Sequence, residues 1–230
     1  MSSITDEFRV YPLPAETDHH NLIQLNTEGA DERAASHRSF GVASDAYLSD
    51  LQEQVDSLTR GAKIRATIRD ATSPGLAVFD GEFEQLDDES VYIDYCILSS
   101  LPESLQSMAM KLTETEFPQA AVFDERVQET GPGVLVECYP RFGSHDALWL
   151  DMLIGKRPLE DRLASIPRVN EPARDVLIQI PRSGRAFAIY YFAAESHEEM
   201  AEYRAMMNTP RGSTHDLGDL YEGVVADDSW

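Results

Sequence analysis

The chain has 230 residues, of which 42% are hydrophobic, so it can build one large domain or two small ones around a real core. Asp and Glu number 41 against 19 Lys and Arg, giving a formal net charge of −22. No run approaches the roughly 18 apolar residues of a membrane span, and Met1–Val10 lacks the basic start and apolar core of a signal peptide, so we expect a cytoplasmic protein.

The first hundred residues alternate between short apolar runs and polar loops. Three short strands come first: Phe8–Pro12, Asn21–Asn26 and Ser36–Val42. Ser44 is placed to cap a helix with Asp45 in its first turn. Apolar residues then recur at helical spacing from Tyr47 to Leu58, and Gly61 follows as a stop. This segment therefore predicts one amphipathic helix after three strands.

Period-two patterns return after this helix. Lys63–Asp70 alternates cleanly between apolar and polar residues, which predicts a half-buried strand. Leu76–Glu84 and Val91–Cys96 are predicted as two further strands, with a turn over 87–90 between them. Three strands, a helix and then two or three strands is the element order of an OB-like barrel. We therefore predict a small OB-like β-barrel domain over residues 1–98.

The pattern becomes helical after residue 98, where a helix carries Leu101, Leu105, Met108 and Leu112 on one face. A hairpin is predicted over Ala121–Gln128 and Val134–Tyr139, and two short helices follow it. Ser144 and Pro158 begin those helices, and Gly155 ends the first. The last predicted helix opens with the capping box Ser196–Glu199.

The second half is organised around one predicted hairpin, Asp175–Phe192. Two apolar runs flank the turn residues Pro181–Gly184, and both runs are apolar on both faces. Such strands are typical of a central position in a sheet. Together with the flanking helices they predict a ferredoxin-like antiparallel α+β sandwich over residues 99–207. Residues 208–230 are polar and aperiodic, which predicts a flexible acidic tail.

Several runs also resemble a known family. Leu153–Leu163, Pro172–Ile178, Phe187–Phe192 and the barrel segment Gly61–Thr67 are similar to segments of a family of halophilic archaeal proteins, a domain of unknown function. The resemblance extends over residues 8–207. It implies a halophilic source, and it implies no activity and no catalytic residue.

The charge balance independently favours a salt-adapted protein. High acidity with only three lysines is similar to the composition of proteins from organisms whose cytosol holds molar salt. The Debye length falls to about 3 Å at 1 M salt, so self-repulsion is screened there. An acidic protein from an organism of ordinary salinity is the alternative.

No sequence motif predicts a catalytic residue, a cofactor or a metal site. His19 and His20 are adjacent in a polar stretch, the other histidines are isolated, and no CxxC pair exists. Ser, His and Asp occur together in Gly143–Asp146 and Gly212–Asp216, but sequence neighbours do not form a triad. We expect Ser144 to cap a helix and the second run to lie in the tail.

The two cysteines and one pair of glutamates are expected to have structural or surface roles, not catalytic ones. Cys96 and Cys138 each lie in an apolar run, so we expect free, buried thiols in a reducing compartment, with a disulfide between them as the alternative. Glu82 and Glu84 are spaced as a pair of glycosidase acids would be on one strand face. Because the chain has so many acids, we expect surface carboxylates instead.

Basic residues are concentrated in two places. Arg141–Arg185 holds eight basic and six acidic residues, the reverse of the overall balance. The candidate anion- or partner-binding face consists of Arg141, Lys156, Arg157, Arg182 and Arg185. A second basic row consists of Arg60, Lys63, Arg65 and Arg69. Internal salt bridges, such as Arg157 with Asp161, are the alternative to a binding face.

These observations predict a halophilic, cytosolic binding or regulatory protein that is not an enzyme, with a protein or ribonucleoprotein partner. One alternative is a nucleic-acid or ribonucleoprotein-associated factor that uses the OB-like part and the basic rows. A second alternative is a hydrolase or transferase whose site lies in the cleft between the two parts.

Overall fold

The structure is a computed structural model that describes residues 3–12, 18–25, 38–45, 47–71, 75–109, 121–122, 134–140, 148–157, 159–163, 173–182, 186–193, 197–206 and 209. The chain divides into two compact units. The first joins Met1–Tyr92 to Asp151–Pro158, and the second joins Ile93–Leu150 to Leu159–Trp230. Across the described ranges, no helix has the length and apolar character needed to cross a membrane.

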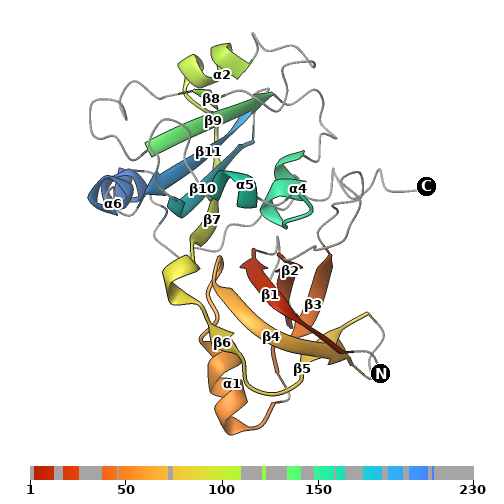
Figure 1. Cartoon of the computed structure of the whole chain (residues 1–230). Helices are drawn as coiled ribbons and strands as arrows, with labels where there is room; N and C mark the ends of the chain where they lie inside the picture. The colour runs from red at the N-terminus through yellow and green to blue at the C-terminus, as the bar shows by residue number, and fades with distance from the viewer. Residues whose placement is uncertain are drawn as a thin grey trace, which may run out of the picture. The chain divides into compact units, whose positions relative to one another are not determined.

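The first unit is a closed five-stranded β-barrel (Figure 1). Its strands are β1 (Ser3–Tyr11), β2 (His19–Gln24), β3 (Ser39–Ala43), β4 (Lys63–Asp70) and β5 (Ala77–Phe79). They are hydrogen-bonded in the order β1-β2-β3-β5-β4, and β4 pairs back with β1 to close the barrel. The β3–β5 pairing is parallel, and the other pairings are antiparallel. The prediction of a small β-barrel is confirmed.

The alternation along β4 shows why this sequence closes into a barrel. Ile64, Ala66 and Ile68 are buried, and the polar residues between them, Arg65 and Thr67, point away from the core. The buried residues pack with Phe8 of β1, Leu22 of β2 and others in one core cluster. Truncating fully buried Ile64 to alanine would cost about 2–5 kcal/mol, because the lost methyl groups leave a cavity.

Helix α1 (Ser49–Asp56) lies between β3 and β4 and packs Val55 against the barrel core. The predicted N-cap at Ser44 is wrong, because the helix begins at Ser49 and its N-cap residue is Leu48. The lead-in is held by the side chain of Gln52: Oε1 accepts from the Tyr47 amide at 3.2 Å, and Nε2 donates to the Ser44 carbonyl at 2.9 Å. These contacts stabilise a non-helical backbone over the segment where the helix was expected.

The strand predicted over Leu76–Glu84 is interrupted. Both β5 and β6 (Glu84–Gln85) pair with β4, and the residues between them leave the ladder. Gly81 lies in this interruption with φ +105°, a conformation that glycine adopts readily. A short 3-10 turn, η1 (Asp87–Glu89), then occupies the place of the predicted turn.

The second unit contains a five-stranded sheet with the order β7-β10-β11-β9-β8. Its strands are β7 (Tyr92–Leu98), β8 (Ala121–Val122), β9 (Val134–Pro140), β10 (Ala173–Pro181) and β11 (Ala186–Ala193). Helices among the described residues of this unit are α2 (Glu103–Ala109), α5 (Glu160–Leu163) and α6 (His197–Met206). Helix α4 (Leu148–Leu153) spans the point where the chain passes from the second unit to the first.

The predicted central hairpin is confirmed. β10 and β11 pair antiparallel with Ile178 opposite Ile189, and they occupy interior positions of the sheet. All eight residues of β11 are buried, so both faces of the sheet are covered. One face carries Leu177 and Tyr190 in a cluster with Leu105 of α2 and Met200 of α6.

The domain boundary differs from the predicted one. β7, which was expected to complete the barrel, instead pairs with β10 in the second sheet, so the first passage between units lies at Tyr92 and not at residue 98. The strand order with β7 at one edge does not confirm the ferredoxin-like arrangement. Of the predicted tail, the structure describes Thr209, which is buried and bonded to Arg204. Residues 210–230 lie outside the described residues.

Candidate functional site

The predicted basic face is divided between the two units. Arg141 and Arg185 lie outside the described residues. Lys156 and Arg157 follow α4 and belong to the first unit, whereas Arg182 follows β10 in the second unit. Arg182 is exposed, and its backbone amide donates to the Leu98 carbonyl at 2.8 Å.

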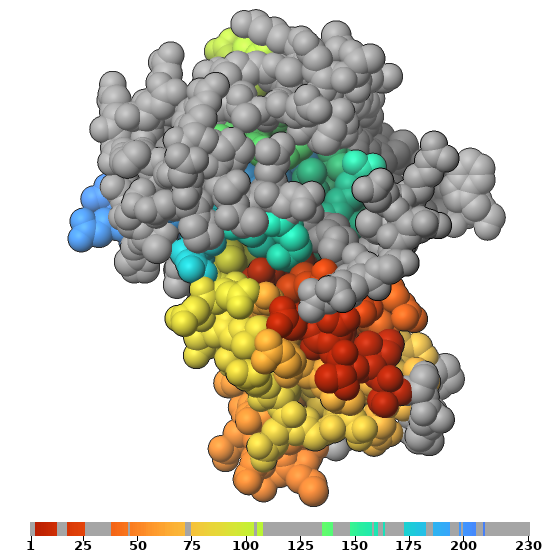
Figure 2. Space-filling model, in the orientation of Figure 1, coloured from red at the N-terminus to blue at the C-terminus, as the bar shows by residue number. Residues whose placement is uncertain are grey.

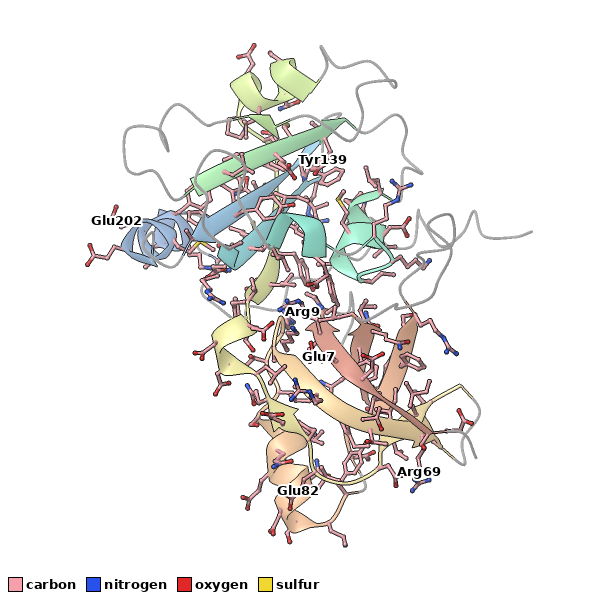
Figure 3. The ribbon with its side chains drawn as sticks, in the orientation of Figure 1. Glu7, Arg9, Arg69, Glu82, Tyr139 and Glu202 are labelled. Atoms are coloured by element: carbon pink, nitrogen blue, oxygen red, sulfur yellow. The ribbon has the colours of Figure 1, made fainter. Side chains whose placement is uncertain are left out.

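Three members of the second basic row, Lys63, Arg65 and Arg69, belong to β4 and pair with acidic residues. Glu7 of β1 bridges Lys63 at 2.9 Å and Arg65 at 2.8 Å. Lys63 also pairs with Glu89, and Arg65 pairs with Glu84 at 2.6 Å. Figure 3 shows Glu7 on β1 beside β4, and Figure 2 shows β1 (red) at the surface of this unit.

The rest of the row has partners as well. Arg69 pairs with Asp80 at 3.2 Å at the far end of β4, and Arg60 is half-buried in the turn before the strand. Lys63, Arg65 and Arg69 thus lie on one strand, where they alternate with acidic partners instead of forming a purely basic row. This arrangement offers an anion few uncompensated cations.

These pairs shift the ionisation of their members. Hydrogen bonds from Lys63 and then from Arg65 lower the pKa of Glu7. Partial burial alone would lower the pKa of Lys63, but its bonds to Glu89 and Glu7 outweigh burial and raise it. Both groups therefore stay charged over a wide pH range.

The connection after α4 is anchored on the outer face of β1 and β2. Asn21 Nδ2 donates to the Ile154 carbonyl at 2.7 Å. Gly155 has φ +77°, and a Cβ atom there would lie 2.6 Å from Ile23 Cγ1 and 2.8 Å from Tyr11 Cγ. Only a glycine fits this close approach without displacing its neighbours. Tyr11 and Ile23 point outward from the barrel, and both are almost completely buried.

The anchored connection presents two cations to solvent. Lys156 and Arg157 are both exposed, and Lys156 has a long 3.8 Å contact with Asp151. The backbone amide of Arg157 donates to the Asp151 carbonyl at 3.0 Å, which closes the turn. Within the described part of the chain, no carboxylate pairs with the Arg157 side chain, and Asp161, the partner considered from the sequence, has no described side chain.

Two buried arginines were missed by sequence reasoning. Arg9 of β1 is 4% exposed, and its Nη1 donates to the Gly61 carbonyl at 2.9 Å and the Glu89 carbonyl at 3.2 Å. Arg204 of α6 is also 4% exposed, and it bonds Asp94 and Asp175. The available signal was the two carboxylates, since each interrupts or borders an apolar strand run.

The described residues contain no group of three His, Cys, Asp or Glu side chains that would hold a metal ion. Cys96 and Cys138 are free and buried, as predicted. Glu137 and Tyr139 form a hydrogen bond of 2.6 Å on β9, but both side chains are sealed inside the second unit. Glu82 is exposed, and Glu84 pairs with Arg65.

The remaining chemical candidates, Gly143–Asp146 and Gly212–Asp216, lie outside the described residues. Comparison of the chain with protein-family models, with curated proteins and with solved structures finds no match.

Proposed function

We propose that the chain is a non-catalytic binding protein whose barrel unit presents Lys156 and Arg157 to an acidic segment of a protein partner. The observation that carries this proposal is the anchored turn: Gly155 and Asn21 hold it on the barrel while both cations remain exposed. The chain has a net charge of −22, yet these two adjacent exposed cations make only one contact, of 3.8 Å, with the carboxylates that the structure describes.

The form of the site favours a compact anionic group over an extended polyanion. The second basic row is occupied by Glu7, Glu84, Glu89 and Asp80, so a phosphate backbone lying along β4 would meet as many carboxylates as cations. Arginine binds one carboxylate with two parallel hydrogen bonds. Short contacts of this kind survive salt concentrations that screen long-range attraction.

The test uses two labelled probes, an eight-residue oligoglutamate peptide and an eight-nucleotide oligouridylate, with binding measured by fluorescence anisotropy at about 0.5 M KCl. We expect the wild-type chain to bind the peptide, and Lys156→Glu with Arg157→Glu to weaken that binding about tenfold, the effect of losing two exposed ion pairs. Arg65→Glu is the matched charge-reversal control and should leave peptide affinity nearly unchanged. No peptide binding, or equal binding by the double variant, overturns the proposal.

The barrel supports a second candidate. Its strand order β1-β2-β3-β5-β4, closed by β1, with a helix between the third and fourth strands, supports the OB-like classification, and OB-like barrels commonly bind single strands. Oligouridylate binding stronger than peptide binding would favour this nucleic-acid function. The ferredoxin-like arrangement and the relation to halophilic archaeal proteins remain proposals beside it.

A further inference from the structure

We propose that the outer face of β1 and β2, formed by Tyr11, Asn21 and Ile23, is part of the recognition site because it fixes the conformation of the Lys156–Arg157 turn. The inference rests on the proposed function and adds a group of positioning residues to it. None of the three needs to touch the ligand. They act through Gly155 and the Ile154 carbonyl.

The first support is the steric fit at Gly155. The backbone there approaches the barrel so closely that a Cβ atom would overlap Ile23 Cγ1 and Tyr11 Cγ. Real Cβ atoms do not come within 3.0 Å of such neighbours, and here one of them is the core of an aromatic ring. A shift of the turn is therefore the expected response to any larger residue at this position.

The second support is the polar anchor one residue earlier. Asn21 is 8% exposed, and its Nδ2 donates 2.7 Å to the Ile154 carbonyl. A short bond from a buried amide fixes the direction of the peptide unit that leads into Gly155. The next two residues are Lys156 and Arg157, so their backbone directions follow from this anchor.

The third support is the turn's own closure. The Gly155 amide donates to the Met152 carbonyl at 3.3 Å, and the Arg157 amide donates to the Asp151 carbonyl at 3.0 Å. These bonds tie the basic pair to the end of α4. If the barrel face moves Gly155, both bonds are strained and the two cations separate from their present geometry.

Docking of the turn on the barrel and binding of an anion by Lys156 and Arg157 are then thermodynamically linked. An anion that needs both cations in one arrangement stabilises the docked turn, and a docked turn binds that anion more tightly. A matched control exists in the same unit: Gly81 also has positive φ, +105°, but an added Cβ there would meet nothing within 4 Å. Gly81→Ala reports the cost of the backbone conformation alone, and Gly155→Ala adds the steric displacement.

The experiment measures two quantities in the full-length chain. The first is native-state trypsin cleavage after Lys156, followed by mass spectrometry. The bond after Arg157 precedes Pro158 and resists trypsin, so one cut reports the turn. We expect Gly155→Ala to raise this cleavage rate about tenfold over Gly81→Ala, since undocking exposes the bond. The second is oligoglutamate affinity, which should fall in Gly155→Ala and stay unchanged in Gly81→Ala.

Ile23→Ala supplies the rescue variant. It removes the Ile23 Cγ1 and Cδ1 atoms that an added Cβ would strike, so Gly155→Ala with Ile23→Ala should recover part of both losses. Equal cleavage and equal affinity in the two glycine variants overturn the inference. If the wild-type chain binds no oligoglutamate but Gly155→Ala still accelerates cleavage, the proposed function fails while the anchoring of the turn stands.

Discussion

Replacement of Arg204 by methionine tests how strongly one buried cation holds the second unit together. Nη1 of Arg204 donates to Asp94 Oδ2 at 3.1 Å and to the Thr209 carbonyl at 3.3 Å. Nη2 donates to Asp175 Oδ1 at 3.0 Å. The side chains of the three charged residues are between 1% and 5% exposed, so water contributes little to solvating their charges. One cation thus joins α6 to β7 and β10.

The magnitude follows from burial. Removing one partner of a buried ion pair costs about 3–5 kcal/mol, because the remaining charge stays in a poorly solvated place. Arg204→Met leaves two such carboxylates, so we expect the upper end of that range. A domain has only about 5–15 kcal/mol of stability, and for a chain of this size the change corresponds to a fall in melting temperature of about 10 °C or more.

The assay is urea unfolding followed by tryptophan fluorescence. The chain has two tryptophans, so a Trp230→Phe background leaves Trp149, which is fully buried in the second unit, as the reporter. Arg65→Met is the control: the ion pairs of Arg65 are shorter than those of Arg204, but its side chain is 51% exposed. We expect its loss to be a small fraction of that in Arg204→Met.

Removing the two uncompensated carboxylates should rescue the Arg204→Met variant. Asp94→Asn with Asp175→Asn in the Arg204→Met background removes both uncompensated charges and should recover much of the loss. A loss below about 1 kcal/mol in Arg204→Met would refute the argument. So would a triple variant that is no more stable than the single one, since charge would then not be the cause.

Four further outcomes are expected. Raising KCl from about 0.1 M to about 2 M should raise the urea midpoint, because salt screens the self-repulsion of a chain of −22, and a flat midpoint would contradict the halophilic interpretation. Deleting residues 211–230 should leave the melting temperature nearly unchanged, whereas deleting 208–230 also removes Thr209, a partner of Arg204, and should lower it by several degrees. Cys96 should resist iodoacetamide in the native chain at pH 8, because burial raises its pKa to about 12. This pKa lies above the value of about 9 in the unfolded chain, so the unfolded state loses the thiol proton first as the pH rises. The stability gained from the neutral thiol is therefore complete below about pH 9 and is lost toward pH 12. Urea titrations of Cys96→Ala should show a smaller loss of unfolding free energy over this pH window. Arg182→Glu with Arg185→Glu should leave thermal melting nearly unchanged, because Arg182 is exposed, and should weaken capture of an acidic partner; unchanged capture would remove the hairpin tip from the binding face.

Local alternation was enough to predict β4 and the central hairpin. In β4 each apolar residue faces the barrel core, so the pattern alone determines the strand and its bounds, Lys63–Asp70. β1 was predicted too short because Asp6 and Glu7 are disfavoured in strands. They belong to β1 because β4 supplies partners, with Glu7 opposite Arg65 in the register. Such compensation depends on pairing and is absent from a single-segment pattern.

The start of α1 and the sheet to which β7 belongs were predicted wrongly for related reasons. Ser44 satisfies the local rule for a cap, but Gln52 binds its carbonyl and holds the segment outside the helix. β7 has the pattern of a barrel strand, and only its pairing with β10 assigns it to the second sheet. Local propensity identifies such elements well and their partners poorly.

In the candidate site too, the local element could be predicted and its long-range contacts could not. Gly155 was predicted to end a helix, and a glycine with positive φ does follow α4. Its contact with Tyr11 and Ile23 joins segments more than 130 positions apart, so no window of sequence contains it. The basic character of Lys156 and Arg157 was visible in the sequence, but the surface that holds them was not.

The arginines of this chain are better understood by their surroundings than by their number. Arg9 and Arg204 are buried and bond carbonyls or carboxylates, so their charge serves the fold. Arg65 is exposed but shared between two acids, so its charge is largely neutralised within the barrel. Arg157 is exposed, and none of the described carboxylates pairs with it. Under the proposed function, an arginine of this last kind is the one expected to attract an outside anion, and the anchored turn beneath it should restrict binding to anions of matching geometry.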